Sequence, residues 1–383
     1  MKYDFDQLIN RRESDSVKWN FYKEEILPLW VADMDFLSPP FVISDLRDRI
    51  EHGVFGYSKP QFSTKEAVQF WLDKRHNWKV HIDDILFLPG VVPGFNVASK
   101  AVTNPGDSVL FQTPAYHPFF NVSSNSKLRQ IESPLSCNED GSYYFSLKHF
   151  ENSISEDTRL FLLCNPHNPT GRVFTQTELN EMAETCLNHN IIICSDEIHS
   201  DIIFPENKHI PIASLSNEIA DISITLLSAS KTFNLAGLKS SVAVITNPDL
   251  RIAFQAAANG IIGSVNLLGE TAMRSAYING EDWLRSLLSY LENNRDELVE
   301  YVYQNLPGIK VHSPEGTYLA WLDCTEARLE EPADYFLREA QVGLNSGSWF
   351  GALYKDFVRI NFGCPRERML IGLDRMKESL KKT

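Results

Sequence analysis

The sequence predicts an α/β protein in which a doubly wound sheet is followed by a second, smaller domain. Helical patterns fill most of the intervals between short apolar runs, and this alternation is typical of a sheet covered by helices on both faces. The chain has 383 residues, more than one domain usually contains, and 43% of them are apolar, enough for real cores. The apolar runs that predict strands occupy residues 85–88, 108–111, 160–164, 191–194, 224–227 and 242–245.

The N-terminal part of the chain predicts an extended arm. Residues 1–40 show little helical periodicity, and the Ser-Pro-Pro break at 38–40 precedes a helix from about residue 41. We therefore assign residues 1–45 to an N-terminal arm and part of the small domain. A second helix is expected to begin at residues 63–66, because Ser-Thr-Lys-Glu has the spacing of a capping box, and to end near residue 76.

The remaining elements predict a large domain at residues 46–278 and a small C-terminal domain at residues 279–383. In the large domain, Thr175 and Glu178 have capping-box spacing ahead of an apolar-periodic helix. Beyond about residue 278 the rhythm changes to one long helical pattern, which Pro307 and Gly308 close. The small domain should then contain a strand at 317–322, a helix after 331–332, a strand at 357–362 and a terminal helix led by Pro365.

Charge and cysteine content argue against several kinds of partner. The net charge of −14 is spread along the chain, and no basic run could follow a phosphate backbone, so we expect no nucleic acid. No segment approaches the length of a bilayer span and the N-terminus lacks a long apolar core, so we expect a soluble, unprocessed protein without membrane contact. The six cysteines show no paired ligand spacing, which predicts no metal site and fits reduced thiols in the cytoplasm.

The stretch at residues 226–239 combines the features of a cofactor anchor. An apolar run leads to Ser228, Ser230 and Lys231, and a glycine and Lys239 follow. A lysine where a buried strand gives way to a loop can be desolvated, which lowers its pKa and frees the amine to form a Schiff base. The hydroxyls and Lys239 would suit a phosphate group. The alternative is a solvated loop, the usual place for a Ser-Lys pair after a strand.

Three further strand ends carry unusual polar residues, and ligands bind at the carboxyl ends of strands in a doubly wound sheet. Gly90 precedes a helix start, where backbone amides and the helix dipole can hold a phosphate. Residues 165–172, Asn-Pro-His-Asn-Pro-Thr-Gly-Arg, favour a surface turn by composition alone. Asp196 directly follows a buried strand and would need a cationic partner there, with a helix cap as the alternative.

These stretches resemble the motifs of the class I/II aminotransferase family of pyridoxal-phosphate enzymes, and the resemblance covers nearly the whole chain. It implies fold type I, the aspartate aminotransferase-like fold, with a mostly parallel seven-stranded sheet in the large domain. Within the family, residues 30–36 and 314–323 are similar to the MalY/PatB-type cysteine–sulfur lyases, the cystathionine beta-lyases. The motifs are Asn-Pro-His-Asn-Pro-Thr-Gly at 165–171, Ser-Asp-Glu-Ile-His at 195–199 and Ser-Ala-Ser-Lys-Thr-Phe-Asn-Leu-Ala-Gly-Leu at 228–238.

The resemblance implies that pyridoxal 5'-phosphate is the cofactor. Lys231 would hold it as a Schiff base, and Asp196 would pair with its pyridine nitrogen. Asn168 would hydrogen-bond its phenolic oxygen, with His199 placed as a second partner. Tyr116 would stack on the ring and belong with Lys231 and Asp196 to the catalytic residues, although core packing is the alternative for it. The phosphate would be held by the amides of Gly90, Val91 and Val92, the hydroxyls of Ser228 and Ser230, and Lys239, where many relatives have arginine.

The same resemblance assigns residues to the substrate and to a second subunit. Arg359 would grip the α-carboxylate of an amino acid with its planar fork, and Ala32 would also contact the substrate. Without the family, a solvated strand arginine is the alternative. Tyr57 would reach the phosphate of the neighbouring subunit, which implies a homodimer with shared active sites. A buried aromatic is the alternative for Tyr57.

The implied reaction begins when an amino acid displaces Lys231 from the cofactor, because the freed amine is then the base for the α proton. Two outcomes diverge from there. Elimination would release a thiol from cystathionine or a similar sulfur amino acid and give pyruvate and ammonia, whereas transamination would need a 2-keto acid. The lyase-like stretches at 30–36 and 318–323 favour elimination. An aminotransferase is the alternative, and a non-catalytic cofactor-binding sensor is a weaker one.

Overall fold

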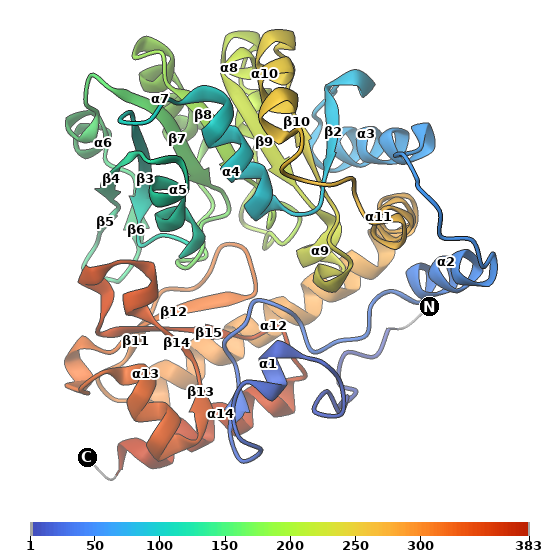
Figure 1. Ribbon diagram of the computed structural model, residues 1–383. Coiled ribbons are helices and arrows are strands. Elements are labelled where there is room, and N and C mark those ends of the chain that lie inside the picture. The colour runs from blue at the N-terminus through green and yellow to red at the C-terminus, as the bar shows by residue number, and fades with distance from the viewer. Residues whose placement is uncertain (1–2, 382–383) are drawn as a thin grey trace.

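A seven-stranded, mostly parallel sheet forms the centre of the larger part of the molecule (Figure 1). The structure, a computed structural model, describes residues 3–381. Strand β10 runs antiparallel to its neighbours β2 and β9, and the other strand pairs are parallel. The predicted fold class is confirmed. In spatial order the strands are β2 (Ile85–Leu88), β10 (Ser241–Val244), β9 (Ser223–Leu227), β8 (Ile192–Asp196), β7 (Thr158–Cys164), β3 (Ser108–Thr113) and β4 (Arg129–Pro134).

Helices cover both faces of this sheet, which explains why its strands are nearly continuous apolar runs. On one face, Phe95, Phe119 and Phe254 lie in a common core with strand residues. On the other face, Leu179 and Met182 pack over the sheet in the same way. Each fully buried side chain of this size contributes about 1.5–3 kcal/mol of hydrophobic free energy. The helices are α4 (Val91–Val102), α5 (Pro118–Ser126) and α10 (Pro248–Ala258) on the first face, and α6 (Leu147–Ser153), α7 (Gln176–Asn188) and α8 (Asn217–Asp221) on the second.

The edge strand β4 was absent from the sequence predictions. Its sequence is Arg-Gln-Ile-Glu-Ser-Pro, and most of its side chains are exposed or half-buried. A solvated edge strand needs no apolar run, so periodicity cannot detect it. The six predicted strands are all present, with ends that differ by one or two residues.

Two predicted helix starts have different outcomes. Helix α7 begins with the predicted capping box, since Thr175 and Glu178 each bond to the backbone of the other. Helix α3 (Phe62–His76) begins before Ser63, so the capping box predicted there is wrong. Glu270, on α11 (Leu267–Asn279), takes over the role: its Oε1 accepts from the Gln61 amide at 2.6 Å and from the Thr64 hydroxyl at 2.9 Å. A cap supplied from that distance leaves no local sequence pattern.

The C-terminal part of the chain forms a second, antiparallel sheet against long helices. The long predicted helix is α12 (Glu281–Asn305), and the terminal helix α14 (Arg366–Leu380) follows Pro365 as predicted. No helix among residues 3–381 is long and apolar enough to cross a membrane. The sheet order is β11 (Lys310–Val311), β12 (Leu319–Asp323), β15 (Phe357–Asn361) and β14 (Asn345–Ser346), with α13 (Pro332–Tyr335) and a π-helical turn Phe336–Ala340 beside it.

The N-terminal arm lies along this second sheet rather than apart from it (Figure 1). Strand β1 (Leu27–Pro28) pairs in parallel with β13 (Val342–Gly343), joining the two ends of the chain. The helix expected from about residue 41 is α2 (Pro40–Glu51). Further short elements are α1 (Val17–Asn20), the β5 (Ser136–Cys137) and β6 (Tyr143–Tyr144) pair, and α9 (Ala229–Thr232).

Arm residues 30–36 are fixed from several directions. The side chain of Asn234 bonds to the backbone of Met34 and Phe36, and the side chain of Asn361 donates to the carbonyl oxygens of Val31 and Asp33. The fully buried carboxylate of Asp35 accepts from Trp19 and forms ion pairs with Arg11, Lys18 and Arg368. Removing one partner from such a buried charge network costs about 3–5 kcal/mol. These contacts hold the backbone of residues 30–36 in one position.

Candidate active site

The carboxyl ends of the parallel strands meet at one cavity of about 770 Å³. In adjacent parallel strands, Cys164 lies opposite Asp196 and Asp196 opposite Leu226, so the loops that follow these strands emerge side by side. Arm residue Ala32 and β15 residue Arg359 complete the wall. Every predicted site residue except Tyr57 lines the cavity: Ala32, Gly90, Val91, Val92, Tyr116, Asn168, Asp196, His199, Ser228, Ser230, Lys231, Lys239 and Arg359.

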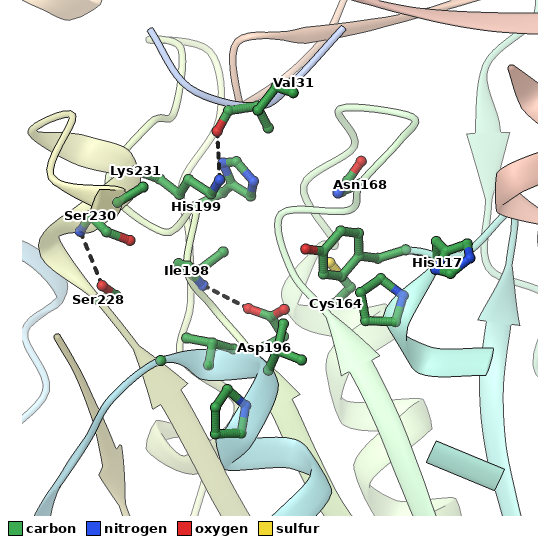
Figure 2. A pocket seen from close by; sticks show the side chains of 18 of the residues that line it. Val31, His117, Cys164, Asn168, Asp196, Ile198, His199, Ser228, Ser230 and Lys231 are labelled. Atoms are coloured by element: carbon green, nitrogen blue, oxygen red, sulfur yellow. Dashed lines mark hydrogen bonds between the residues drawn. The ribbon is translucent and has the colours of Figure 1, made fainter. Parts of the chain in front are cut away.

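Lys231 lies on α9, a single helical turn that follows β9, and its side chain extends past His199 (Figure 2). Its Nζ donates to the carbonyl oxygen of Ala32 at 2.5 Å. Burial lowers the pKa of Lys231 to about 8, although the charge of Asp33 opposes the shift. The solvated loop that sequence alone allowed is therefore wrong. A large share of this amine is neutral near pH 8, the form that attacks a carbonyl carbon.

Asp196 is the last residue of β8 and is 4% exposed. Its Oδ1 accepts from the Ile198 amide at 3.1 Å, and burial raises its pKa to about 7. Within residues 3–381 no cationic side chain lies within ion-pair distance of this carboxylate. A carboxylate in this setting gains stability from a cationic ligand atom, which would restore its ionised form.

Arg359 is a buried cation without an acidic partner among residues 3–381. It is 5% exposed, its guanidinium lies 5.0 Å from the centre of the Phe350 ring, and burial lowers its pKa to about 10. One terminal nitrogen donates to Asn168 Oδ1 at 2.7 Å, and the other donates to Asn345 Oδ1 at 2.6 Å and to the carbonyl oxygen of Trp30 at 3.0 Å. Its Nε has no partner within residues 3–381. The solvated arginine is wrong, and the geometry favours an anionic ligand.

The loop at residues 165–171 is buried, so the surface turn that its composition favoured is wrong. Asn168 uses its amide oxygen to accept from Arg359, which leaves its NH2 group to donate into the cavity. His199 is 2% exposed, and burial lowers its pKa far below the usual range, so its imidazole is neutral. Its Nδ1 has no partner in the described chain. Asn168 and His199 thus present polar groups ready for an uncharged or anionic ligand oxygen.

Another set of cavity residues has the groups of an anion site. The amides of Val91 and Val92 belong to the first turn of α4, where no helical carbonyl can accept from them. Lys239 is exposed and forms no ion pair with any of residues 3–381. Ser228 accepts from the Ser230 amide at 3.1 Å and donates to the Ser240 carbonyl at 2.6 Å. Its hydroxyl would have to exchange that second bond to bind a ligand.

The two predicted aromatic residues lie in different environments. Tyr116 lines the cavity, half-buried, and its pKa is raised by burial and by the charge of Asp196. Tyr57 is fully exposed and is not among the residues lining the cavity, so the buried aromatic considered for it is wrong. Residues 51–59 around it are all exposed.

Some cavity residues were missed by sequence reasoning. Asn345 lies on the two-residue strand β14, which is too short for a periodic pattern, and it reaches the site by holding Arg359. Trp349 and Phe350 follow in a 3-10 turn and form an aromatic wall with Trp30, whose ring centre is 6.2 Å from that of Trp349. His117 is next to the predicted Tyr116. Among these missed residues, the adjacent aromatic pair Trp349 and Phe350 was the one feature of the sequence that could have indicated a binding site.

Comparison with known families agrees with this geometry. The description "Aminotransferase class I and II" belongs to the family model that matches residues 24–376. The chain belongs to that family. Among its members, the cystathionine beta-lyase PatB of Bacillus subtilis is 39% identical, with 98% of this chain and 99% of that protein covered. The protein MalY of Escherichia coli is 30% identical, with 97% of each chain covered.

Solved structures of similar proteins extend the comparison across the aminotransferase class I and II fold. Cystalysin from Treponema denticola, whose crystal structure contains pyridoxal 5'-phosphate, matches with a TM-score of 0.96 at 33% identity over 100% of both chains. The pyridoxal-phosphate-bound C-S lyase from Staphylococcus hominis matches with a TM-score of 0.93 at 32% identity, over 99% of this chain and 98% of that one. These likenesses confirm fold type I and the predicted MalY/PatB-type subgroup.

Proposed function

We propose that this protein is a pyridoxal-phosphate-dependent cysteine–sulfur lyase, which releases a thiol from L-cystathionine or a similar sulfur amino acid and forms pyruvate and ammonia. The single observation that carries the proposal is that one cavity holds both Lys231, with its lowered pKa, and Arg359, which is buried with no carboxylate partner in the described part of the chain. Lys231 supplies a reactive amine, and Arg359 supplies a binding site for an α-carboxylate. The names of the relatives above support the sulfur-specific reaction.

The residues present fit the cofactor. Lys231 would bind it covalently, and the carboxylate of Asp196, otherwise without a cation, would pair with the protonated pyridine nitrogen. The NH2 group of Asn168 would donate to the phenolic oxygen, and the Nδ1 of His199, which has no partner among residues 3–381, would be a second partner for it. Tyr116 would stack on the ring. The phosphate would be held by the amides of Gly90, Val91 and Val92, the hydroxyls of Ser228 and Ser230, and Lys239.

When bound, pyridoxal phosphate supplies an electron sink for negative charge that develops at the α-carbon of the substrate. The side chains of the protein bind and orient the substrate and transfer its protons. Arg359 holds the α-carboxylate, and Ala32 borders the substrate. The amine of Lys231, once the amino group of the substrate has released it, would remove the α proton. The electron pair of that C–H bond would form a double bond to the β-carbon as the bond to sulfur breaks, and the proton would pass to the departing thiolate. The released enamine would then take up water to give pyruvate and ammonia. Asp196 would keep the ring nitrogen cationic, and the aromatic side chains of Trp30, Trp349 and Phe350 line the same cavity.

The deciding experiment supplies L-cystathionine with and without a keto acid. A lyase releases thiol, ammonia and pyruvate in equal amounts over many turnovers without a keto acid. The alternative, an aminotransferase, would stop after one turnover until 2-oxoglutarate was supplied and would release little thiol. A cofactor-binding sensor would bind with a spectral change and yield neither product. We expect thiol release that is independent of keto acid, and a strict keto-acid requirement would overturn the lyase assignment.

We also infer a homodimer with shared active sites, in the cytoplasm. The loop between α2 and α3 lies on the outside of the molecule (Figure 1), and its Val54, Phe55 and Tyr57 are 61%, 58% and 113% exposed. Such an apolar run is the kind of surface that a second copy of the chain would cover, with Tyr57 reaching the partner's phosphate site. All six cysteines are free thiols, which supports a reducing compartment.

A further inference from the structure

The end of β8 and the loop that follows it present residues to two sides. Asp196 and His199 line the cavity, whereas Glu197 and Asp201 are buried behind it. Glu197 accepts from the Ser195 hydroxyl at 2.9 Å and lies 2.8 Å from the Nε2 of His209. The backbone of this loop is therefore anchored by groups that never meet the ligand.

Asp201 connects this loop to the lysine turn. It is 3% exposed, and its Oδ2 accepts from the hydroxyl of Thr232 at 2.8 Å. Its Oδ1 accepts from the Trp71 indole at 3.0 Å and lies 3.3 Å from the Nε2 of His76. These partners hold the carboxylate in one orientation, so Thr232 meets a fixed acceptor.

Thr232 is next to Lys231 and is the last residue of α9. A helix of four residues has no stability of its own, so contacts at its two ends must hold it in place. Ser228 caps the first end through the Ser230 amide. At the other end the Phe233 amide bonds back to Ala229, and the fully buried hydroxyl of Thr232 makes a charge-assisted bond to Asp201.

A nearby residue shows that a buried threonine hydroxyl is not by itself an anchor. Thr225, on β9, is also fully buried, but its Oγ1 has no partner in the described part of the chain. The hydrogen-bonded ladder of the sheet positions its backbone instead. The Thr232 hydroxyl differs because the turn it belongs to has no such ladder.

We propose that Asp201 is a positioning residue that acts through the Thr232 hydroxyl to hold the amine of Lys231 at the reacting carbon. The proposal deepens the function proposed above and rests on it for the turnover measurement. Arg359, which would hold the substrate's carboxylate, lies on β15, so that binding site is independent of the Thr232–Asp201 bond. Loss of the Thr232–Asp201 bond should therefore slow proton transfer by Lys231 without weakening substrate binding.

The test compares holoenzymes of the wild type with Thr232→Val, Thr232→Ser and Thr225→Val. Valine keeps the shape of threonine and removes the hydroxyl, serine keeps the hydroxyl, and Thr225→Val makes the same change where the hydroxyl is idle. We expect Thr232→Val to lower kcat about ten- to a hundredfold, the effect of a small misplacement of a reacting group. Its KM should stay within about twofold of the wild type, and the other two variants should resemble the wild type.

A second readout needs no substrate. Cofactor-free protein is mixed with pyridoxal phosphate, and the visible band and the borohydride-fixed label on the Lys231 peptide are followed in time. Thr232→Val should form both about tenfold or more slowly than Thr225→Val. Because this measurement is independent of turnover, a wild type without lyase activity would overturn the proposed function and still leave the positioning role testable.

Three results would overturn the proposal: unchanged kcat and labelling in Thr232→Val, equal losses in Thr232→Val and Thr225→Val, or equal losses in Thr232→Val and Thr232→Ser. If circular dichroism shows that Thr232→Val is unfolded, Asp201→Asn serves in its place, since an amide oxygen is a weaker acceptor of the same shape. Asp201→Asn should then lower kcat and slow labelling at unchanged KM, and wild-type behaviour in it would reject the role.

Discussion

The guanidinium of Arg359 donates to the amide oxygen of Asn168 at 2.7 Å, across 191 residues of sequence. This bond joins the residue expected to hold the substrate's carboxylate to the residue expected to face the cofactor's ring. It also fixes the orientation of the Asn168 amide, because an oxygen engaged by a cation cannot exchange places with the NH2 group. If Arg359 and Asn168 have the proposed roles, this one contact would orient the groups that bind both the substrate and the cofactor.

Replacing Arg359 by alanine should raise KM for amino acids roughly ten- to a hundredfold, because it removes a charge-assisted pair worth about 1.5–3 kcal/mol. Steady-state kinetics measure the effect. The cofactor should stay bound to Lys231, with its visible band shifted because Asn168 loses the bond that orients its amide. Arg359→Lys is the matched control: it keeps the charge, loses the two-pronged fork and should fall between the two. Substrate kinetics that stay at the wild-type level in Arg359→Ala would contradict the carboxylate role.

The purified protein should be yellow, and borohydride should fix the cofactor onto Lys231. Because burial lowers the pKa of Lys231 to about 8, the neutral amine increases about tenfold per pH unit below pH 8 and levels off above it. Capture of added pyridoxal phosphate by the cofactor-free protein should follow the same curve. Peptide mapping checks the site, with Lys239 as the internal comparison. A label on any other lysine, or no capture at all, would reject the assignment.

Asp196→Asn should stabilise the cofactor-free protein at pH 8 while weakening the binding of pyridoxal phosphate. Burial raises the folded-state pKa of Asp196 from 3.8 to about 7, so its stabilising contribution is complete below pH 3.8 and is lost as pH rises through 7. The loss amounts to at most about 4 kcal/mol, at roughly 1.4 kcal/mol per pKa unit. Asparagine stays neutral at every pH, so the variant does not lose this stability as pH rises.

Thermal melts at pH 4 and pH 8 measure this difference, and Asp73→Asn, at an exposed position of α3, is the control. The gain should appear at pH 8 and be nearly absent at pH 4. A variant that melts below the wild type at pH 8 in the absence of cofactor would show that Asp196 already has a compensating partner.

Mixing Tyr57→Phe subunits with Lys231→Ala subunits should restore active sites if Tyr57 crosses between subunits. In a mixed dimer both defects fall on one site, and the other combines an intact Lys231 with an intact Tyr57. Turnover at limiting cofactor should then exceed that of either variant alone. Size-exclusion chromatography confirms that dimers form and exchange. Activity equal to the average of the separate variants would argue that Tyr57 serves its own subunit or none.

The sequence predicted the elements whose burial leaves a pattern and missed those held from a distance. The apolar strands, the Thr175 cap and the long α12 were found because each is local. The start of α3 was misplaced because its cap, Glu270, is more than 200 residues away in sequence. The solvated edge strand β4 has no apolar run at all.

The site shows the same division. Lys231 and Asp196 follow apolar strands and could be found individually, and the family resemblance supplied Arg359 and Asn168. The burial of Asn168 was not predictable from composition, because an Asn- and Pro-rich loop such as 165–171 is usually exposed. Asn345 stayed hidden because the two-residue strand β14 that carries it leaves no periodic pattern.

The binding of arm residues 30–36 to β15 has a consequence for how the protein folds. The Trp30 carbonyl accepts from Arg359 across 329 residues, and the Asn361 amide donates to the Leu29 carbonyl. Contacts of such long range form late, since closing a loop of this length costs entropy before any bond repays it. We expect amide exchange during refolding to protect the strands of the large sheet before Asn361. Residues 30–36, which precede every strand of the large sheet in sequence, would then reach their native contacts after those strands have formed.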